Sequence, residues 1–215
     1  MISPLLANLY LHWFDVRFSR VEGPGQWAKA HLVRYADDFV ILARCIDARM
    51  TRWVEQVVEG WLGLTVNRTK TRVLRLQPEP RTQVDFLGYT FRYRWDRFGR
   101  SQWYLTAEPS AKAVARLSAE LRTLIGPRQA FWPLPEVVEQ VNRVLRDWRP
   151  YFSFGYPQVA YRHLNRLVIG RFTQHLRRRS QRACRPPAGQ SVYTFLTERL
   201  GLQLLARANS SIVDR

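Results

Sequence analysis

Hydrophobic and polar positions divide the chain into a first part with short apolar runs and a second part with long helical periodicity. Two of the short runs, 32–36 and 39–43, flank the pair Asp37-Asp38, which predicts a β-hairpin with both carboxylates at its tip. Further strands are predicted at 73–76, 84–87, 90–95 and 102–105, with a turn at 96–99. Together these later strands predict a small antiparallel sheet.

Two helices are expected in the first part. Ser3-Pro4 is typical of a helix start, and the stripe expected to face the core consists of Leu6, Leu9, Tyr10, Trp13 and Phe14. Asp47 is a candidate cap for a second helix, which is expected to run to Leu62 and to end at Gly63, with 64–66 extended.

The second part predicts a three-helix bundle. Its helices are expected at 111–125, 135–149 and 157–179, separated by Gly126-Pro127, Pro133, Pro150 and the region around Gly155, and a shorter helix is expected at 192–200. The fold class is therefore α+β. An antiparallel sheet with helices is expected in residues 1–107, and an all-α three-helix bundle in residues 108–215.

Positive charge is concentrated in the second part. The 215 residues hold 34 Lys and Arg against 17 Asp and Glu, a net charge of +17, of which residues 1–107 contribute +6 and residues 108–215 contribute +11. A basic excess of this size on a folded chain indicates a polyanionic partner, by default a nucleic acid, because phosphate contacts release condensed counterions. Nearly all the basic residues are arginines, which suit bidentate phosphate contacts, although the codon usage of a GC-rich genome explains that bias equally well.

The remaining composition narrows the class of protein. A chain that is 46% hydrophobic and 13% aromatic is typical of a packed globular protein. Cys45 and Cys184 are too few for a disulfide framework or a zinc site. No apolar run approaches the length of a membrane span, and the N-terminus lacks the order of a signal peptide, so we expect a cytoplasmic protein without membrane contact.

The acidic pair, Asp37 and Asp38, is the first candidate for chemistry. Two adjacent carboxylates repel each other and resist joint ionisation, and a bound divalent cation removes that cost. Magnesium prefers oxygen ligands and keeps positions open for substrate phosphates, so the pair is a candidate two-metal site for phosphoryl transfer. An ordinary solvated Asp-Asp turn is the alternative.

Tyr35-Ala36-Asp37-Asp38 between two apolar strands resembles the catalytic loop of reverse transcriptases. Four other segments match the group II intron branch of that family in order: Ile2 to His12, the palm segment Leu62-Gly63-Leu64 with Asn67, Lys70 and Thr71, the primer-grip hairpin Asp85 to Tyr89, and the maturase signature Asn142 to Phe152. Each segment alone is a weak signal, and their order and spacing carry the resemblance. It covers the chain from Ile2 to about Leu205, and it implies a partial reverse-transcriptase palm in 1–107 and a thumb/maturase domain in 108–215.

The resemblance implies roles for individual residues of the palm. Asp37 would bind the catalytic Mg²⁺ ions, Asp38 would bind or support them, and Ala36 would let the primer end approach beside Tyr35. Lys70 would stabilise or protonate the pyrophosphate leaving group, with a solvated lysine as the alternative. Leu87, Gly88 and Tyr89 would contact the substrate as part of the primer grip.

The basic half carries the candidate nucleic-acid-binding residues. Arg143, Arg146 and Arg149 fall along one side of a predicted helix, and a second cluster consists of Arg171, Arg177, Arg178, Arg179 and Arg182. A solvated charged face is the alternative for both groups. The aromatic residues Tyr151, Phe152, Phe154 and Tyr156 are candidates for stacking on unpaired RNA bases, although Phe152 is expected in the core.

Taken together, the resemblance implies a reverse transcriptase/maturase whose partners are group II intron RNA and an RNA/DNA template–primer duplex. The family's third metal-binding Asp, its Pro-Gln-Gly-Gly turn and its fingers region would precede this sequence, so an N-terminally truncated form is expected. Purified protein given primer, template, nucleotides and magnesium is then expected to extend nothing. The alternatives are an RNA-binding module without catalysis, a non-functional remnant of a mobile intron gene, or a chain complemented by a separate N-terminal fragment.

Overall fold

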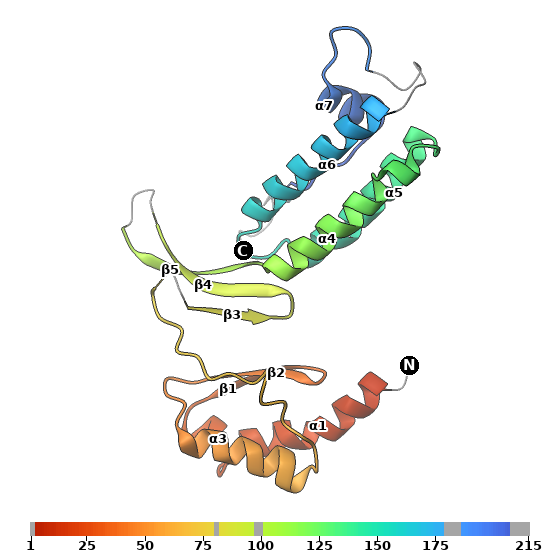
Figure 1. Ribbon diagram of the computed structural model, residues 1–215. Helices are drawn as coiled ribbons and strands as arrows, with labels where there is room; N and C mark the ends of the chain where they lie inside the picture. The colour runs from red at the N-terminus through yellow and green to blue at the C-terminus, as the bar shows by residue number, and fades with distance from the viewer. Residues whose placement is uncertain (1–2, 80–81, 97–100, 179–185, 207–215) are drawn as a thin grey trace, which may run out of the picture. The chain divides into compact units, whose positions relative to one another are not determined.

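The computed structural model describes residues 3–79, 82–96, 101–178 and 186–206. The chain divides into two compact units, residues 1–75 and 76–215. Helices and small antiparallel sheets make up both units, which confirms the α+β class (Figure 1). The predicted boundary after Ala107 separates the palm and thumb regions of the family, whereas the boundary between residues 75 and 76 separates two compact units. The palm–thumb boundary stays a prediction.

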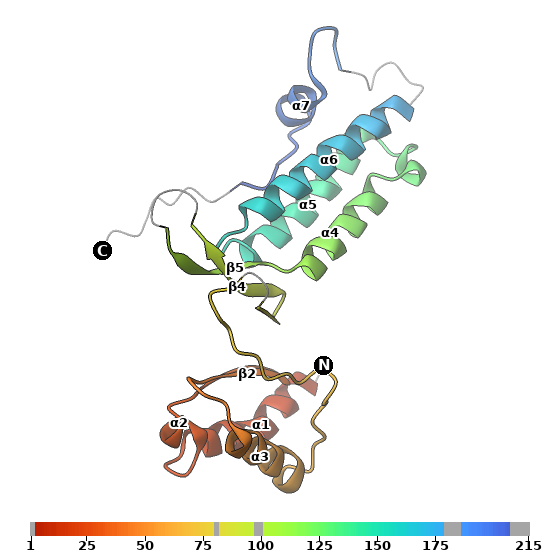
Figure 2. The same cartoon turned by 60° about the vertical axis from the view of Figure 1, so that its left-hand side comes forward.

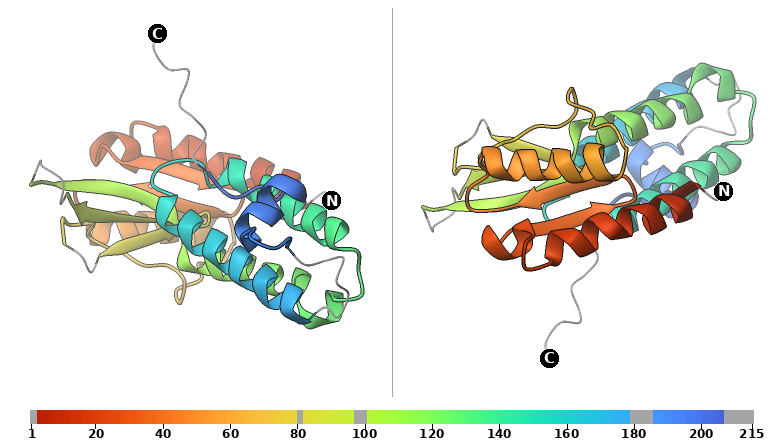
Figure 3. Two further views of the ribbon diagram at one scale, coloured as in Figure 1. Left: turned by 90° about the horizontal axis from the view of Figure 1, so that it is seen from above. Right: turned by 90° about the horizontal axis from the view of Figure 1, so that it is seen from below.

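A two-stranded sheet covered on one face by helices forms the first unit. β1 (His31–Tyr35) pairs antiparallel with β2 (Asp38–Leu42), which confirms the predicted hairpin. α1 (Ser3–Ser19) and α3 (Ala48–Glu55) lie on the same face of this hairpin, and the short helix α2 (Pro24–Trp27) joins α1 to β1 (Figure 3). The buried core between helices and sheet consists of Leu11, Phe14, Phe18, Ala30, Met50, Val57, Val58 and Leu62.

α1 buries a different stripe from the predicted one. Phe14 is fully buried as expected, and Leu11 and Phe18 are buried beside it at helical spacing. The other four predicted members are exposed: Leu6, Leu9, Tyr10 and Trp13. Because the first turns of α1 carry apolar residues on several sides, periodicity alone did not identify the side that packs, and the predicted stripe was wrong for these four residues.

The second predicted helix is confirmed, and its last turns are π-helical. The Asp47 carboxylate accepts a hydrogen bond of 2.9 Å from the backbone N–H of Met50, which caps α3 as expected. The helix continues from α3 into η1 (Gln56–Trp61). Gly63, with a φ of +65°, ends it because glycine adopts the left-handed conformation without a Cβ clash.

The strand predicted at 73–76 is wrong. The chain from Thr71 to Gln77 is irregular, and Val73 and Leu74 are exposed. A strand forms only where a second strand satisfies its backbone groups, and within the described residues this apolar run pairs with none. The local composition therefore indicated a strand that the tertiary structure does not form.

Three antiparallel strands in the order β3-β4-β5 form the sheet of the second unit. β3 (Gln83–Phe86), β4 (Tyr89–Trp95) and β5 (Trp103–Pro109) confirm the last three predicted strands, and β5 extends four residues beyond the expected end. The predicted turn at 96–99 falls largely on residues 97–100, which lie outside the described residues. β4 places Phe91 and Tyr93 on one face of this sheet and Arg92 on the other.

A buried ion cluster lies on the polar face of this sheet. The Glu108 carboxylate accepts hydrogen bonds from Arg92 at 2.7 Å and from Nη2 of Arg94 at 2.8 Å, and the Glu108 side chain is 11% exposed. Burial by itself raises the pKa of Glu108, but the hydrogen bonds from Arg94 and Arg92 outweigh it and hold that pKa below its usual value. Glu108 is therefore ionised in the folded protein at neutral pH.

Acid is expected to weaken the second unit through Glu108. Because the folded-state pKa is lowered, the ion cluster stabilises the fold fully above the unfolded pKa of about 4.3, and this contribution is lost as pH falls through the folded-state value. Urea unfolding between pH 6 and pH 2.5 measures the effect. Glu108→Gln should flatten the acid limb of this stability profile, while the exposed Glu120→Gln should not. An unchanged acid limb in Glu108→Gln would contradict the prediction.

The helical bundle of the second unit is confirmed. α4 (Ala111–Leu124), α5 (Leu134–Tyr151) and α6 (Gln158–Arg178) run side by side in both views (Figure 1, Figure 2). Ser110 caps α4 by accepting a hydrogen bond of 3.2 Å from the N–H of Ala113. Pro150 was predicted to end α5, but the helix continues through it to Tyr151. Proline has no N–H to donate to the carbonyl one turn earlier, and in the last turn of a helix this loss affects only a carbonyl close to the helix end.

Two buried or half-buried asparagines fix the segment that follows the last helix. The shorter helix predicted at 192–200 is confirmed as α7 (Val192–Thr194) continuing into η4 (Phe195–Arg199). After it, the Asn142 side chain donates to the carbonyl of Gly201 at 2.9 Å and accepts from the N–H of Gln203 at 2.8 Å. Asn165 makes the same pair of contacts with the backbone of Leu205. Residues 201–205 are thereby fastened to α5 and α6.

Candidate active site and nucleic-acid interface

A two-residue turn presents the acidic pair. Tyr35 and Asp38 are the last cross-strand partners of the β1–β2 hairpin, so Ala36 and Asp37 alone form the turn. Ala36 has a φ of +52°, a conformation that L-residues seldom adopt outside tight turns. Both carboxylates are exposed. The hairpin therefore brings together the four predicted residues from Tyr35 to Asp38 and directs the acidic pair to solvent.

Alternation along the strands gives the hairpin two different faces. Leu32, Phe39 and Ile41 point to the covering helices and pack against the buried core of the first unit. Tyr35 and Asp38 point to the other face, where the Tyr35 ring is 67% exposed. A substrate that approached the acidic pair from this face would meet the Tyr35 ring beside the Asp38 carboxylate.

The acidic pair has the donor chemistry of a magnesium site. Neither carboxylate forms a hydrogen bond or an ion pair with any described residue, so all four carboxylate oxygens are open to a ligand. Within the described ranges no group of three or more His, Cys, Asp or Glu residues could hold an ion. Two carboxylates suit a cation that completes its octahedral shell with water or substrate phosphate, which is how Mg²⁺ commonly binds.

Lys70 lies in the same unit, in a turn after η1. Its backbone N–H donates to the Asn67 carbonyl at 3.1 Å, and its side chain is exposed. Arg68 in this turn pairs with Glu59 at 2.9 Å. The structure thus leaves the Lys70 ammonium at the surface, and its role at a leaving group stays a prediction.

The predicted primer-grip residues form the turn between β3 and β4. Leu87 and Gly88 have φ of +48° and +76°, as a two-residue hairpin turn requires. The Tyr89 hydroxyl donates to the Tyr151 carbonyl, and the Tyr151 hydroxyl donates to the Leu87 carbonyl at 2.7 Å. A Cβ on Gly88 would lie 3.3 Å from the Phe152 ring. This turn is therefore anchored on the end of α5, in the second unit.

The predicted aromatic residues at the end of α5 divide between core and surface. Phe152 is buried as expected and stacks on Trp148 with ring centroids 4.3 Å apart. Tyr151, Phe154 and Tyr156 are exposed, and Phe154 is 71% exposed. The exposed three have accessible rings, and stacking on RNA bases stays a prediction for them.

The three predicted arginines of α5 lie outside the bundle core. Arg143 and Arg146 are exposed, and Arg149 is half-buried. Arg146 forms a surface ion pair of 3.2 Å with Glu139. Arg146 and Arg149 also line a shallow pocket together with Ser153 and Gln203. Arg143 and Arg146 are thus accessible at the surface, and nucleic-acid binding stays a prediction for all three arginines.

The second arginine cluster is only partly described. Arg177 and Arg178 are exposed at the end of α6. Arg171 is half-buried, and its guanidinium donates to the carbonyl of Arg122 at 3.3 Å near the end of α4. Arg179 and Arg182 lie outside the described residues. Arg177 and Arg178 are thus the described members of this cluster that are most accessible to a ligand.

Sequence reasoning missed Arg34, which contacts the turn of the acidic pair, and the two residues of α1 that hold Arg34. Arg34 of β1 donates to Asp15 and Asn8 of α1 and to the carbonyl of Ala36. The sequence did contain a signal, because Arg34 shares the inward face of β1 with Leu32. A charged residue on a face that packs against a core needs a partner.

Two family models match the chain. Residues 1–91 match the model described as reverse transcriptase (RNA-dependent DNA polymerase), and residues 114–191 match the model described as group II intron, maturase-specific domain. No curated protein matches the chain. None of the described helices combines the length and the apolar character needed to cross a bilayer.

These matches contain the candidate site residues described above. The reverse transcriptase match contains the acidic pair on its hairpin, and the maturase match contains α5 and α6 with their arginines. Reverse transcriptases use divalent metal ions and act on nucleic acid, and maturase domains act on intron RNA. With both models matched in consecutive order, the chain belongs to the group II intron reverse transcriptases/maturases.

Proposed function

We propose that the chain binds the RNA of its group II intron through the exposed arginines of the helical bundle, and that the acidic pair binds magnesium for RNA-directed DNA synthesis. The observation that carries the RNA-binding proposal is the two-sided character of α5. Val138, Val141 and Leu145 are buried in the bundle core, while Arg143 and Arg146 are exposed. The exposed ion pair of Arg146 with Glu139 contributes little energy, so Arg146 can exchange it for a phosphate.

Electrostatics predicts how the RNA-binding constant depends on salt concentration. Each phosphate that an arginine neutralises releases counterions, so the logarithm of the binding constant falls with the logarithm of salt concentration by roughly 0.7 to 0.9 per contact. Arginine contacts to the backbone carry no base specificity, and the shape of the folded intron would provide the selectivity. Steep salt dependence combined with a preference for folded intron RNA is therefore the expected signature.

Arg143→Gln/Arg146→Gln should weaken binding of folded intron RNA about tenfold and lower the salt slope by roughly two units. Fluorescence anisotropy between 50 and 200 mM salt measures both quantities, with an unstructured RNA of equal length for comparison. Arg128 is an exposed arginine of the short helix η2 (Pro127–Gln129), outside α5, so Arg128→Gln is the matched control for the loss of a positive charge. Equal salt slopes in the double variant and the parent would refute RNA binding by α5.

Nucleotide transfer at the acidic pair is proposed from its exposure and its donor set. A magnesium ion held by Asp37 and Asp38 would polarise the phosphoryl oxygens of an incoming nucleotide. Tyr35 would border the nucleotide on the open face of the hairpin, and the exposed ammonium of Lys70 would offset charge on the leaving pyrophosphate. The substrate class that suits such a centre is an RNA/DNA template–primer duplex, and a complementary N-terminal fragment is the polypeptide partner that the resemblance suggests.

An RNA-binding module without catalysis is the second candidate function. The two-sided character of α5 supports it independently of the palm, because it involves the second unit alone. A chain that binds intron RNA with the expected salt slope, but binds no divalent ion at the acidic pair, would be such a module. A chain that does neither would be a non-functional remnant.

A further inference from the structure

Arg34 places a charged side chain on the covered face of the β1–β2 hairpin. Its side chain is 13% exposed, and its neighbour along that face of β1, Leu32, packs against the apolar core. Removing a guanidinium from water is costly unless hydrogen bonds replace its hydration. The position of Arg34 is therefore explained only by the groups that it contacts.

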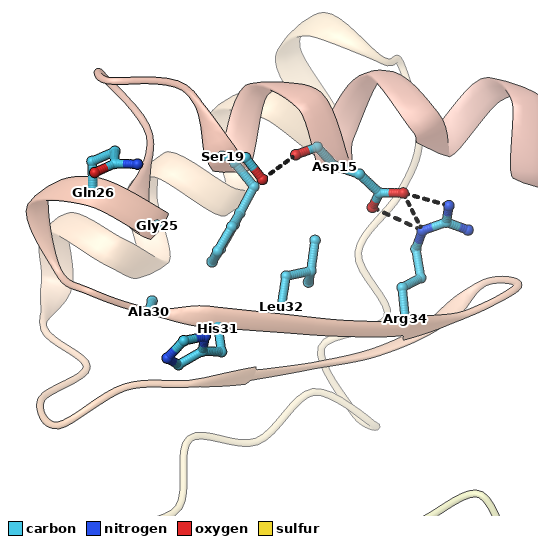
Figure 4. Close-up of a pocket in the computed structure, with 9 residues that line it drawn as sticks. Asp15, Ser19, Gly25, Gln26, Ala30, His31, Leu32 and Arg34 are labelled. Carbon is cyan, nitrogen blue, oxygen red and sulfur yellow. Dashed lines mark hydrogen bonds and ion pairs between the residues drawn. The ribbon is translucent and has the colours of Figure 1, made fainter.

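The guanidinium of Arg34 donates hydrogen bonds to groups of three residues. Nε and Nη2 donate to the two Asp15 carboxylate oxygens, at 2.9 Å and 2.6 Å (Figure 4). Nη1 donates to the Asn8 side-chain oxygen at 2.9 Å and to the backbone carbonyl of Ala36 at 2.8 Å. Asn8 and Asp15 are seven residues apart, which places them on the same side of α1, two turns from each other. Hydrogen bonding to Asp15 also raises the pKa of Arg34, so the group stays charged.

The contact with Ala36 reaches the turn that carries the acidic pair. The peptide that joins Ala36 to Asp37 is planar, so a hydrogen bond that fixes the Ala36 carbonyl also fixes the orientation of the Asp37 N–H. Ala36 holds a φ of +52°, which a residue with a Cβ adopts only when its surroundings enforce it. Arg34 is one such constraint, and α1 supplies the rigid support behind it.

We propose that Asn8, Asp15 and Arg34 form a clamp that holds the Ala36-Asp37 turn in the conformation in which Asp37 and Asp38 bind a divalent cation together. The three residues are positioning residues and not metal ligands, because Arg34 acts on the turn through the Ala36 carbonyl. This inference rests on the proposed function, namely that the acidic pair binds magnesium.

Because Arg34 is charged, electrostatics and positioning predict opposite changes in cation affinity when it is replaced. A positive charge near two carboxylates repels a cation, so electrostatics alone predicts that Arg34→Gln binds a divalent ion more tightly. Loss of positioning predicts weaker binding, because the two carboxylates no longer share one geometry. Mutation of groups that orient metal ligands typically weakens metal affinity about tenfold to 100-fold.

The test is a titration of the whole chain with Mn²⁺, a magnesium substitute whose free form is detected by electron paramagnetic resonance. Arg34→Gln and Arg34→Lys should both weaken Mn²⁺ binding about tenfold, because lysine keeps the charge but cannot span three acceptors. Arg44→Gln removes an exposed positive charge from the same unit and should leave the affinity unchanged or slightly higher. Unchanged or tighter binding in Arg34→Gln would overturn the clamp.

Two further measurements separate the clamp from neighbouring explanations. Mn²⁺ binding that Asp37→Asn/Asp38→Asn leaves unchanged would show that the proposed metal site itself is wrong, whatever Arg34→Gln does. Asn8→Ala removes a single exposed contact, so it should leave the unit folded and still weaken Mn²⁺ binding two- to threefold. In folded Asn8→Ala and Arg34→Lys, the amide ¹⁵N resonance of Asp37 should shift, since it reports the hydrogen bond at the Ala36 carbonyl. An unmoved resonance together with parental Mn²⁺ affinity in these variants would refute the clamp.

Discussion

Asp37→Asn/Asp38→Asn is expected to weaken Mn²⁺ binding by the chain on the order of 100-fold, because the charge and number of oxygen ligands set the affinity for hard divalent cations. Both carboxylates are exposed, and no described residue competes for them. The substitution therefore removes negative charge and leaves the apolar packing of the hairpin in place. The parent and variant should melt at similar temperatures while differing strongly in the Mn²⁺ titration.

Glu22→Gln provides the matched control for this result. Glu22 is an exposed carboxylate of the first unit, so its loss lowers the negative charge of the same unit without touching the hairpin turn. Parental affinity in Glu22→Gln would assign the effect to the acidic pair and not to overall charge. A titration in which the acidic-pair variant and the control behave alike would remove the basis for a metal site at the hairpin.

Asn142→Ala is expected to destabilise the second unit by about 1 to 3 kcal/mol, the largest effect on stability among the substitutions considered. Asn142 is buried, and its amide hydrogen-bonds both Gly201 and Gln203. Alanine would remove both hydrogen bonds, each worth about 0.5 to 1.5 kcal/mol because Gly201 and Gln203 are exposed and water can reach their backbone groups. Urea unfolding monitored by tryptophan fluorescence gives the change in the free energy of unfolding.

Two companion variants check the physical reason for that loss. Asn142→Asp retains the oxygen that accepts from Gln203 but places a buried carboxylate oxygen against the Gly201 carbonyl in place of a donor, so it should also destabilise the unit. Gln140→Ala changes a half-buried amide two residues away on α5 and should cost less than 1 kcal/mol. If Asn142→Ala and Gln140→Ala cost the same, the contacts with residues 201–203 do not hold the C-terminal segment.

Asn142 also bears on the basis of the family resemblance. The segment from Asn142 to Phe152 resembles a maturase signature, and in the structure its first and last residues are both buried. Asn142 fastens the segment after η4, and Phe152 stacks on Trp148 beneath the β3–β4 turn. The residues between them include the exposed Arg143 and Arg146. A single signature thus combines positions that build the bundle with positions that are open to RNA.

Local chemistry determined much of this protein from the sequence by itself. The hairpin around Asp37 and Asp38 follows from two β-prone runs with a polar turn, and the start of α4 follows from the Ser110 cap. The end of the α3–η1 helix follows from Gly63, whose conformation depends on its own missing Cβ. Each of these features depends on residues a few positions apart, so the sequence contains the complete cause.

Only the tertiary structure decided which partners these elements take. The sequence predicted that α1 buries Leu6 and Leu9, whereas the structure buries Leu11 and Phe18. Both sets are apolar, and the choice depends on the sheet that packs against them. The run 73–76 has the composition of a strand but no partner in the described structure. The contact of Arg34 with Asp15 joins residues 19 positions apart, and that of Asn142 with Gly201 joins residues 59 apart. Periodicity and capping act within a few residues, whereas such contacts exist only once the chain has folded.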